Sequence, residues 1–263
     1  MVEHFHGKEE VASSIPAVGT KYILYILLMI KFFLEKINRF ISSKKILKLI
    51  FLYHKLFGEK NIGDIGFNFL DKPSRLEIVS ETIQRKKFNT YLEIGCFDNQ
   101  LFNHINISKT GVDPYKGGNI KLKSDDFFKI NKKKYDCIFI DGLHTYEQVI
   151  KDIANSLHCI NQNGIIFVHD CLPNNVYVQN IPRSTYVWNG DVWKAIVEMR
   201  TKKDLQTYTI NADYGIGVIF KKKNQDTLNI NETNFKKLKF KDFYYNHKNW
   251  LNIIEYNEFK NIF

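Results

Sequence analysis

The stretch Cys137–Ile153, "CIFIDGLHTYEQVIKDI", joins an apolar run to a helical pattern through a short polar segment. The apolar run continues a predicted strand from Tyr135 to Asp141, of the kind that is buried on both faces of a parallel sheet. Open α/β sheets bind ligands in the crevice beyond the carboxyl ends of their strands. Asp141 and His144 lie between the strand and the helix, and are therefore well placed for chemistry.

The helix after this strand is the best defined in the sequence. Thr145 and Gln148 have the spacing of a capping box at its start. Apolar side chains then recur at steps of three and four on one face: Tyr146, Val149, Ile150, Ile153 and Leu157.

The same alternation of strand and helix extends from Asn89 to Phe220. Near its end, "QTYTINADYGIGVIF" (residues 206–220) predicts two strands joined by a short turn, which is typical of an antiparallel hairpin. We therefore expect an α/β fold in which a parallel sheet is completed by an antiparallel hairpin. The other predicted strands are Thr90–Gly95, Lys109–Asp113, Asn119–Leu122 and Gly164–His169.

Size and composition favour a globular chain with a full core, since 44% of the 263 residues are hydrophobic. The four cysteines contain no CxxC pair, and three of them lie in or beside apolar stretches. Reduced thiols are the simpler interpretation, so neither a disulfide framework nor a structural zinc site is expected. This indicates a cytoplasmic protein, with association to a membrane as the open alternative.

The net charge of +10 would suit a nucleic-acid or anionic-membrane partner. Lysine, asparagine and isoleucine are abundant throughout, however, which partly reflects an AT-rich coding bias. Because no arginine–aromatic cluster or known binding motif accompanies the charge, a nucleic-acid partner is not expected.

The first part of the chain is apolar and basic. Tyr22–Leu34 is interrupted by Lys31 and is shorter than the ~20 residues that a bilayer span needs. The following "ISSKKILKLIFLYHKLFG" (residues 41–58) has helical spacing and ends at a glycine. Residues 21–57 are thus predicted to form two basic amphipathic helices, which cover the domain, form a homo-oligomer contact, or rest on a membrane surface. The C-terminal end predicts one or two short docking helices.

Two turns have features of a nucleotide-type site. In "YLEIGCFDNQLF" a strand delivers Glu93, and Gly95 allows a close approach of the backbone. Asp113 closes the next strand eighteen residues later, close to the spacing at which a carboxylate binds a ribose hydroxyl. A tight turn alone is the alternative for Gly95. Asp125 and Asp126 either accept a hydrogen bond from an adenine amino group or cap a helix.

Residues Thr90 to Phe220 resemble the class I S-adenosylmethionine-dependent methyltransferases. The pieces that carry the resemblance are "LEIG", "GVDP", "SDDFF", "IFIDGLHTYEQVIKDI", "GIIFVHDCLP", "WNGDVWKAI" and "DYGIGVI", in the order that family uses. More narrowly, they are similar to a branch associated with glycan and natural-product tailoring. The resemblance implies a Rossmann-like seven-stranded methyltransferase sheet in residues 73–222. An N-terminal helical extension (1–72) and a C-terminal extension (223–263) would flank it.

The resemblance also implies roles for the cofactor residues. Glu93 and Gly95 would surround the methionine moiety of S-adenosylmethionine, and Asp113 would hold the ribose. Asp125 or Asp126 would lie near the adenine. Asn99 stands where many members have a second glycine, and asparagine tolerates the left-handed conformation well.

O-methyltransferases of the catechol type, within the same superfamily, bind a divalent ion such as Mg²⁺ beside a general base. The matching residues here are Asp141 and Asp170 for the metal and His144 for the base. Asp141 would also border the cofactor. Cys171 replaces an amide ligand, which is a departure because hard Mg²⁺ prefers oxygen donors. His169 could replace the missing amide ligand only for an ion softer than Mg²⁺.

A neutral histidine suits the removal of a hydroxyl proton during methyl transfer. His144 precedes a helix N-terminus, where the helix dipole disfavours the imidazolium, so we expect a neutral ring at neutral pH. Each of these residues could instead have a purely structural role. His144 would pack or cap, Asp141 and Asp170 would cap helices, and His169 would be a buried core residue.

The acceptor is predicted to meet the aperiodic stretch 171–190, because long irregular segments in compact domains are often lids or binding loops. The predicted substrate-binding residues are His169, Arg183, Trp188 and Asp191. A plain connecting loop anchored by its tryptophans is the alternative.

The leading hypothesis is therefore transfer of a methyl group from S-adenosylmethionine to a hydroxyl of a sugar, glycan or other small acceptor. An NAD-dependent oxidoreductase would share Gly95 and Asp113, but the incomplete glycine fingerprint and the terminal hairpin argue against it. A catalytically inactive membrane-surface binding protein on the same scaffold is the third reading.

Overall fold

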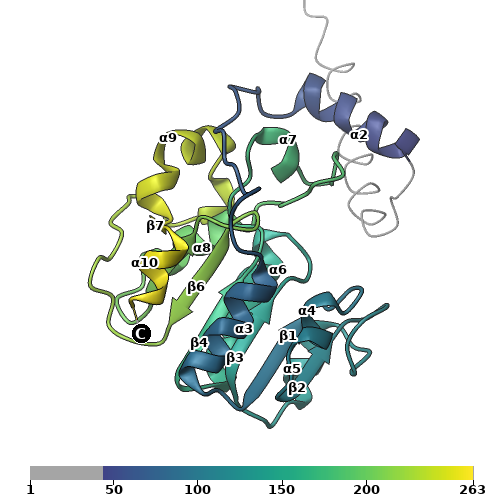
Figure 1. Ribbon diagram of the computed structural model, residues 1–263. Coiled ribbons are helices and arrows are strands. Elements are labelled where there is room, and N and C mark those ends of the chain that lie inside the picture. The colour runs from purple at the N-terminus through teal and green to yellow at the C-terminus, as the bar shows by residue number, and fades with distance from the viewer. Residues whose placement is uncertain (1–43, 263) are drawn as a thin grey trace, which may run out of the picture. The chain divides into compact units, whose positions relative to one another are not determined.

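Seven strands form one mixed sheet in the order β2-β1-β3-β4-β6-β5-β7 (Figure 1). The computed structural model describes residues 44–262. The strands are β1 (Thr90–Ile94), β2 (Ser108–Val112), β3 (Tyr135–Ile140), β4 (Ile160–Val168), β5 (Gln206–Ile210), β6 (Ile216–Phe220) and β7 (Ile253–Ile254). Strands β1 to β4 pair in parallel, while β6 is antiparallel to both β4 and β5. The predicted seven-stranded α/β sheet with an antiparallel hairpin is confirmed.

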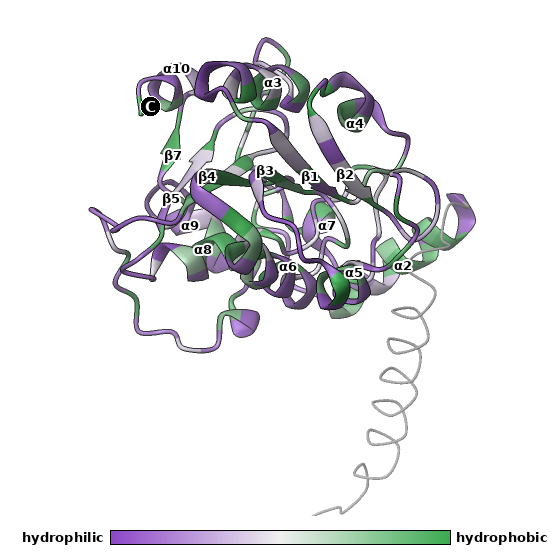
Figure 2. Ribbon diagram, turned by 90° about the horizontal axis from the view of Figure 1, so that it is seen from below, coloured by the Kyte–Doolittle hydropathy of each residue, from purple (hydrophilic) through white to green (hydrophobic). Residues whose placement is uncertain are grey.

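Two layers of helices cover this sheet, as Figure 2 shows. Helices α3 (Arg75–Lys86), α4 (Gln100–His104) and α10 (Tyr256–Lys260) lie on one face. The opposite face is covered by α5 (Ser124–Ile130), α6 (Tyr146–Cys159), α8 (Trp193–Arg200) and α9 (Phe240–Trp250). The remaining elements are α2 (Lys44–Phe57), α7 (Val176–Gln179) and the short 3₁₀ helix η1 (Phe235–Lys237).

The alternation of side chains along the strands divides the core into two clusters. In β3, Ile138 and Ile140 pack with α6 and α8, while Cys137 and Phe139 pack on the α3 side. Because successive strand residues point to opposite faces, a strand covered by helices on both sides is apolar throughout. This is the physical basis of the continuous apolar run in the sequence.

The predicted strand Asn119–Leu122 is wrong. The structure has only a single bridge there, between Val112 and Ile120. The backbone nitrogens of Asn119 and Ile120 both donate to the carbonyl of Gly111, so the segment lies parallel to the end of β2 at one position and does not continue as a strand. The seventh strand is β7, which pairs with β5 from within residues 223–263.

The start of α6 also differs from the prediction. Thr145 is the N-cap residue, but its side chain makes no capping hydrogen bond. Gln148 instead donates to Ser124, Asp125 and Asp152. The backbone nitrogen of Tyr146 donates to Oδ1 of Asp191 over 2.7 Å. A carboxylate from a remote loop therefore replaces the local capping box.

The structure describes only some of the helices that were predicted outside residues 73–222. Tyr22–Leu34 lies outside the described residues, whereas the second predicted helix is α2. Within residues 44–262, every helix is too short or too polar to cross a bilayer. The predicted C-terminal helices are α9 and α10, and their Phe243 and Phe259 are fully buried in the two core clusters. The domain boundaries at residues 72 and 222 stay a prediction.

Candidate active site

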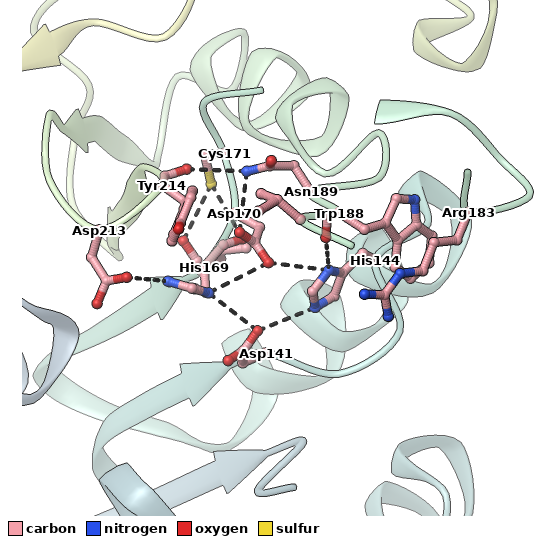
Figure 3. Close-up of polar contacts among 12 residues, drawn as sticks. Asp141, His144, His169, Asp170, Cys171, Arg183, Trp188, Asn189, Asp213 and Tyr214 are labelled. Atoms are coloured by element: carbon pink, nitrogen blue, oxygen red, sulfur yellow. Dashed lines mark hydrogen bonds and ion pairs between the residues drawn. The ribbon is translucent and has the colours of Figure 1, made fainter. Parts of the chain in front are cut away.

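Four ionisable side chains meet at the carboxyl ends of β3 and β4. Asp141 follows β3, and His169 and Asp170 follow β4, so the parallel pairing of these strands brings their ends together. His144 reaches the same point from the turn before α6 (Figure 3). Oδ1 of Asp141 lies 3.2 Å from Nε2 of His144 and 3.3 Å from Nδ1 of His169. The predicted catalytic residues are thus neighbours across one rim of the sheet.

His144 is held by a carbonyl and by an aromatic ring. Its Nδ1 lies 2.8 Å from the carbonyl oxygen of Trp188 and 3.1 Å from Oδ2 of Asp170. The imidazole stacks on the indole of Trp188 with centroids 5.2 Å apart. A proton on Nδ1 that is donated to this carbonyl leaves Nε2 as the nitrogen facing Asp141.

The surroundings of His144 favour the imidazolium, contrary to the expected neutral ring. Burial alone would lower its pKa, but Asp170 and Asp141 outweigh burial and raise the pKa to about 8. Two carboxylates at contact distance therefore have a larger effect than the start of helix α6.

His169 is buried between carboxylates on both sides. Its Nε2 lies 3.2 Å from Oδ1 of Asp213. Its Nδ1 has no hydrogen-bond partner among the described residues, although Asp141 and Asp170 have oxygens within 3.5 Å of it. Burial would lower the pKa of His169, but Asp170 and Asp141 raise it well above the usual value. In return, His169 and His144 overcome the effect of burial and hold the pKa of Asp141 well below its usual range.

Asp213 extends this cluster and was not predicted from the sequence. It lies in the turn between β5 and β6, where its Oδ2 accepts from the backbone nitrogen of Arg75 over 2.6 Å. The guanidinium of Arg75 lies 3.4 Å from Oδ1 of the same carboxylate. The segment "NADYG" was predicted only as a turn, and nothing local in it indicates a partner that follows β4.

Asn189 is a second residue that the sequence reasoning missed. It is buried, and its amide donates to Oδ1 of Asp170 over 3.1 Å and more weakly to the carbonyl of Tyr214. The amide thus joins the acceptor segment, β4 and the hairpin. Its position beside Trp188 in the predicted acceptor loop was the available signal.

The backbone around these residues is strained. Asp170, Asp213 and Tyr214 have φ values of 64°, 41° and 60°, a conformation that side chains other than glycine adopt at a cost. The backbone nitrogens of Cys171 and Leu172 donate to the carbonyls of Gly215 and Tyr214. These bonds fix the hairpin turn against the loop that carries Asp170, which stabilises the strained positions.

Gly95 is the tightest point of the cofactor side. It has a φ of 88°, and a Cβ added there would lie 2.1 Å from the carbonyl oxygen of Asp141. Every side chain is therefore excluded from this turn, which brings the loop after β1 against the loop after β3. Nearby, Glu93 is buried and accepts from the hydroxyl of Tyr91 over 2.7 Å. Burial raises the pKa of Glu93 to about 7.

Asp113 links the loops after β1 and β2. Its Oδ2 accepts from the backbone nitrogen of Phe97, and its Oδ1 accepts from those of Tyr115 and Lys116. A carboxylate offers about four lone-pair sites. Three of them are used here, which leaves room for about one further donor.

The two acidic residues at the start of α5 differ. Oδ1 of Asp125 accepts from the side chain of Gln148 over 2.9 Å, on the side facing α6. Asp126 instead forms an ion pair with Lys129, and both of these side chains are largely exposed. Of the two, Asp125 is the one that contacts α6, the helix that follows His144.

The predicted acceptor residues are largely engaged in holding the loop 171–190. Nε of Arg183 donates to the carbonyl of Thr185, and the guanidinium also contacts the carbonyl of Tyr186. The indole nitrogen of Trp188 donates to the carbonyl of Asn180. Asp191 caps α6 and also pairs with Lys194. Trp188 contacts the cluster through His144, and the guanidinium of Arg183 lies over the Trp188 ring.

Asp141, His144 and Asp170 have the geometry of a cation site, because their ligand atoms lie within 4.8 Å of one another. The buried Nδ1 of His169, without a hydrogen-bond partner among the described residues, is next to the same carboxylates. Cys171 does not fit as a ligand, since its thiol donates to the carbonyl of Val168 and burial raises its pKa to about 12. Two carboxylates and imidazole would suit a first-row transition ion better than Mg²⁺.

Part of this site lies in a segment that matches a known family. Residues 86–171, which include Asp113, Asp141 and His144, match the family model described as a methyltransferase domain. This segment of the chain is therefore similar to a methyltransferase domain. The enzyme class expected from the sequence is S-adenosylmethionine-dependent methyl transfer, and it is confirmed at this level. No curated protein matches the chain.

Solved structures similar to this methyltransferase domain have low sequence identity. An O-methyltransferase from Bacillus cereus in complex with S-adenosylhomocysteine is 11% identical, with 71% of this chain and 96% of that chain covered and a TM-score of 0.44. The Podospora anserina methyltransferase PaMTH1 is 14% identical, with coverages of 68% and 97% and a TM-score of 0.42. TomG from Streptomyces achromogenes, an O-methyltransferase of tomaymycin synthesis, is 10% identical, with coverages of 69% and 100% and a TM-score of 0.42.

Proposed function

We propose that the chain methylates a hydroxyl group of a small acceptor, with sugars and glycans as the first class to test. The observation that supports this most strongly is the convergence of Asp141, His144 and Asp170 at the ends of β3 and β4. An imidazole and two carboxylates next to a methyl donor form a site that can orient a hydroxyl and take up its proton.

The methyl donor would lie across the loops after β1, β2 and β3. Gly95 would admit the methionine moiety close to the backbone, beside Glu93, and Asp113 would use its remaining lone pair for a ribose hydroxyl. Asp125 is the better candidate for the adenine, since it contacts Gln148 of α6, whereas Asp126 forms the shorter lysine pair, with Lys129 over 2.8 Å. Asp141 would border both the donor and the acceptor.

Transfer needs alignment and one proton acceptor. S-adenosylmethionine supplies an electrophilic methyl group, so a carbon–oxygen bond forms as the carbon–sulfur bond breaks and its electron pair stays on sulfur. Nε2 of His144 would take the hydroxyl proton, because Nδ1 is engaged with the carbonyl of Trp188. With a pKa of about 8 for His144, the base form is a minority at neutral pH and increases in alkaline solution.

A divalent cation would be held by Asp141, Asp170 and His144, where it would lower the pKa of the acceptor hydroxyl. In that case His144 would serve as a ligand and would not take up the proton. Both histidines face the same two carboxylates. The cation, a homo-oligomer and membrane contact through residues 21–57 stay predictions from the sequence.

The family match does not favour the two alternatives from the sequence, an NAD-dependent oxidoreductase and an inactive binding protein. Calorimetric titration with S-adenosylmethionine and with NADH separates them from the proposal. We expect heat with the methyl donor and none with NADH. Binding of NADH alone would favour the oxidoreductase, and binding of neither would favour the inactive scaffold.

The acceptor chemistry is tested with methyl-labelled S-adenosylmethionine and a panel of sugars, phenols, amines and carboxylic acids. We expect label on hydroxyl compounds, in products that resist alkaline hydrolysis as ethers do, together with an equal amount of S-adenosylhomocysteine. Label confined to amines, or released by alkali as from a methyl ester, would contradict the proposal.

A further inference from the structure

Helix α2 has two apolar faces, and only one of them is used inside the described part of the chain. Leu47, Ile50 and His54 are buried on one side. Leu49, Leu52 and Leu56 have exposed fractions of 67%, 50% and 65%. Because a helix turns about 100° per residue, these two sets of three lie on opposite sides of the helix. Exposed apolar stripes of this kind usually mark an interaction surface.

The buried face attaches α2 to the loop 171–190. The rings of Phe51 and Tyr177 are 4.5 Å apart, and Nε2 of His54 donates to the carbonyl of Pro182 over 2.9 Å. Figure 1 shows α2 beside α7, which begins this part of the loop. The loop continues to Trp188, whose carbonyl and ring contact His144.

The outward face is basic as well as apolar. The helix contains four exposed lysines (Lys44, Lys45, Lys48 and Lys55) and no acidic residue. Figure 2 shows the hydrophobic and hydrophilic residues side by side along it. Lysines next to a leucine stripe place ammonium groups where they can meet negative charges at the edge of an apolar phase.

We propose that this outward face of α2, the leucine–lysine face, binds the surface of an anionic lipid bilayer. Leu49, Leu52 and Leu56 enter the boundary between headgroups and acyl chains, and the lysines contact lipid phosphates. If the proposed function is correct, this contact holds the acceptor loop at the lipid surface, where a membrane-bound hydroxyl compound would be presented.

Charge favours lipid over the other occupants. A second copy paired through the same face would bring lysines against lysines in a symmetric contact. Residues 21–43 of this chain are also basic, with Lys21, Lys31, Lys36 and Arg39 against Glu35. An anionic lipid surface complements both the leucines and the lysines.

Vesicle co-sedimentation of the full chain tests the proposal. We expect binding to phosphatidylcholine vesicles that contain phosphatidylglycerol, weaker binding in high salt, and little binding to pure phosphatidylcholine. Replacing Leu49, Leu52 and Leu56 together by Ser, or Lys45, Lys48 and Lys55 together by Glu, should weaken binding by roughly ten-fold or more. The matched control is Leu70→Ser with Ile130→Ser, since these side chains are 90% and 65% exposed elsewhere.

A Leu52→Trp variant distinguishes the occupants. Its added fluorescence should resemble that of an exposed indole without lipid and shift to the blue with anionic vesicles. A blue emission before lipid is added, or a dimer in sedimentation that the serine variant abolishes, would overturn the proposal. Unchanged vesicle binding in the serine and glutamate variants would do the same. These measurements require no methyl transfer, so the failure of this proposal is distinct from failure of the proposed function.

Discussion

The cofactor side and the acceptor side of this domain are built by different kinds of contact. On the cofactor side, Gly95 and Asp113 lie in short turns between consecutive strands and bond to backbone within about twenty residues, apart from the contact of Gly95 with Asp141. On the acceptor side, His169 meets Asp213, and His144 meets Trp188, each 44 positions apart in the chain. The first side is therefore set mainly by local sequence, and the second depends on how remote loops pack.

This difference implies that the two sides should fail separately. Damage on the cofactor side should remove donor binding together with stability. Damage on the acceptor side should slow transfer while leaving donor binding intact. The following predictions, from the largest expected effect to the smallest, test that separation.

Replacing His144 by Ala should slow methyl transfer by roughly 10² to 10⁴, because the proton acceptor is lost. The affinity for S-adenosylmethionine should change little, since the ring contacts the acceptor loop. Single-turnover rates with labelled donor, together with calorimetry, measure the two effects. His158→Ala at the exposed end of α6 is the matched control. Equal losses in S-adenosylmethionine affinity and in the rate of methyl transfer would contradict the separation of the cofactor side from the acceptor side.

Replacing Gly95 by Ala should destabilise the fold by more than about 3 kcal/mol and abolish donor binding. Strain at positive φ costs about 1–3 kcal/mol, and the added Cβ would also overlap the carbonyl of Asp141. Gly66→Ala is the control, since Gly66 has a similar φ of 87° and no atom within 4 Å of an added Cβ. Urea unfolding measures the loss of folding free energy in each variant. Gly95→Ala combines steric overlap with backbone strain, whereas Gly66→Ala has the strain alone. Similar losses of stability in the two variants would show that the close approach of Gly95 to the carbonyl of Asp141 is unimportant.

Stability of the ligand-free, EDTA-treated protein should fall as pH rises from about 6.5 through 8. The folded-state pKa of His144 is raised from 6.5 to about 8, so its contribution is complete below 6.5 and is lost as the folded form deprotonates. A shift of this size corresponds to roughly 2 kcal/mol. Urea unfolding across pH in wild type and His144→Gln measures it. A wild-type stability that falls no more steeply with pH than that of the variant would contradict the assigned carboxylate contacts.

Replacing Asp213 by Asn should lower transfer by about ten-fold, as expected for loss of a hydrogen bond to a charged group. His169 would lose the carboxylate that fixes its ring, while donor binding should persist. Because a merely structural loss would not alter ionisation, the pH dependence of transfer should also shift. Asp204→Asn, at an exposed position before β5, is the control. An unchanged pH profile would limit Asp213 to a structural role.

The sequence was sufficient for the parts of the molecule in which side-chain type and period decide the structure. The apolar runs of β1, β3 and β4 and the helical spacing of α6 predicted the sheet and its helices. Asp141 and His169–Asp170 were found because parallel strands end at one rim, which requires no knowledge of the loops. Gly95 was found from its turn, although the contact that demands glycine comes from Asp141, beyond the reach of local pattern.

Other features depend on long-range packing that a single sequence does not display. Asp191 caps α6 from 45 positions away, so the local capping box was a reasonable but wrong choice. The backbone of Asn119 and Ile120 bonds to Gly111, which replaces the predicted strand by a bridge. The predicted charge of His144 was wrong because it also depends on long-range packing. Its two carboxylates come together only in the folded sheet, and their effect exceeds that of the helix dipole.

The most direct test of the central claim is a crystal structure of the chain with S-adenosylhomocysteine. The account predicts the amino-acid moiety of the ligand at the Gly95 turn, its ribose at Asp113, and the sulfur directed at the cluster of Asp141, His144 and Asp170. A ligand bound away from this rim, or a sulfur separated from the cluster by packed side chains, would contradict it.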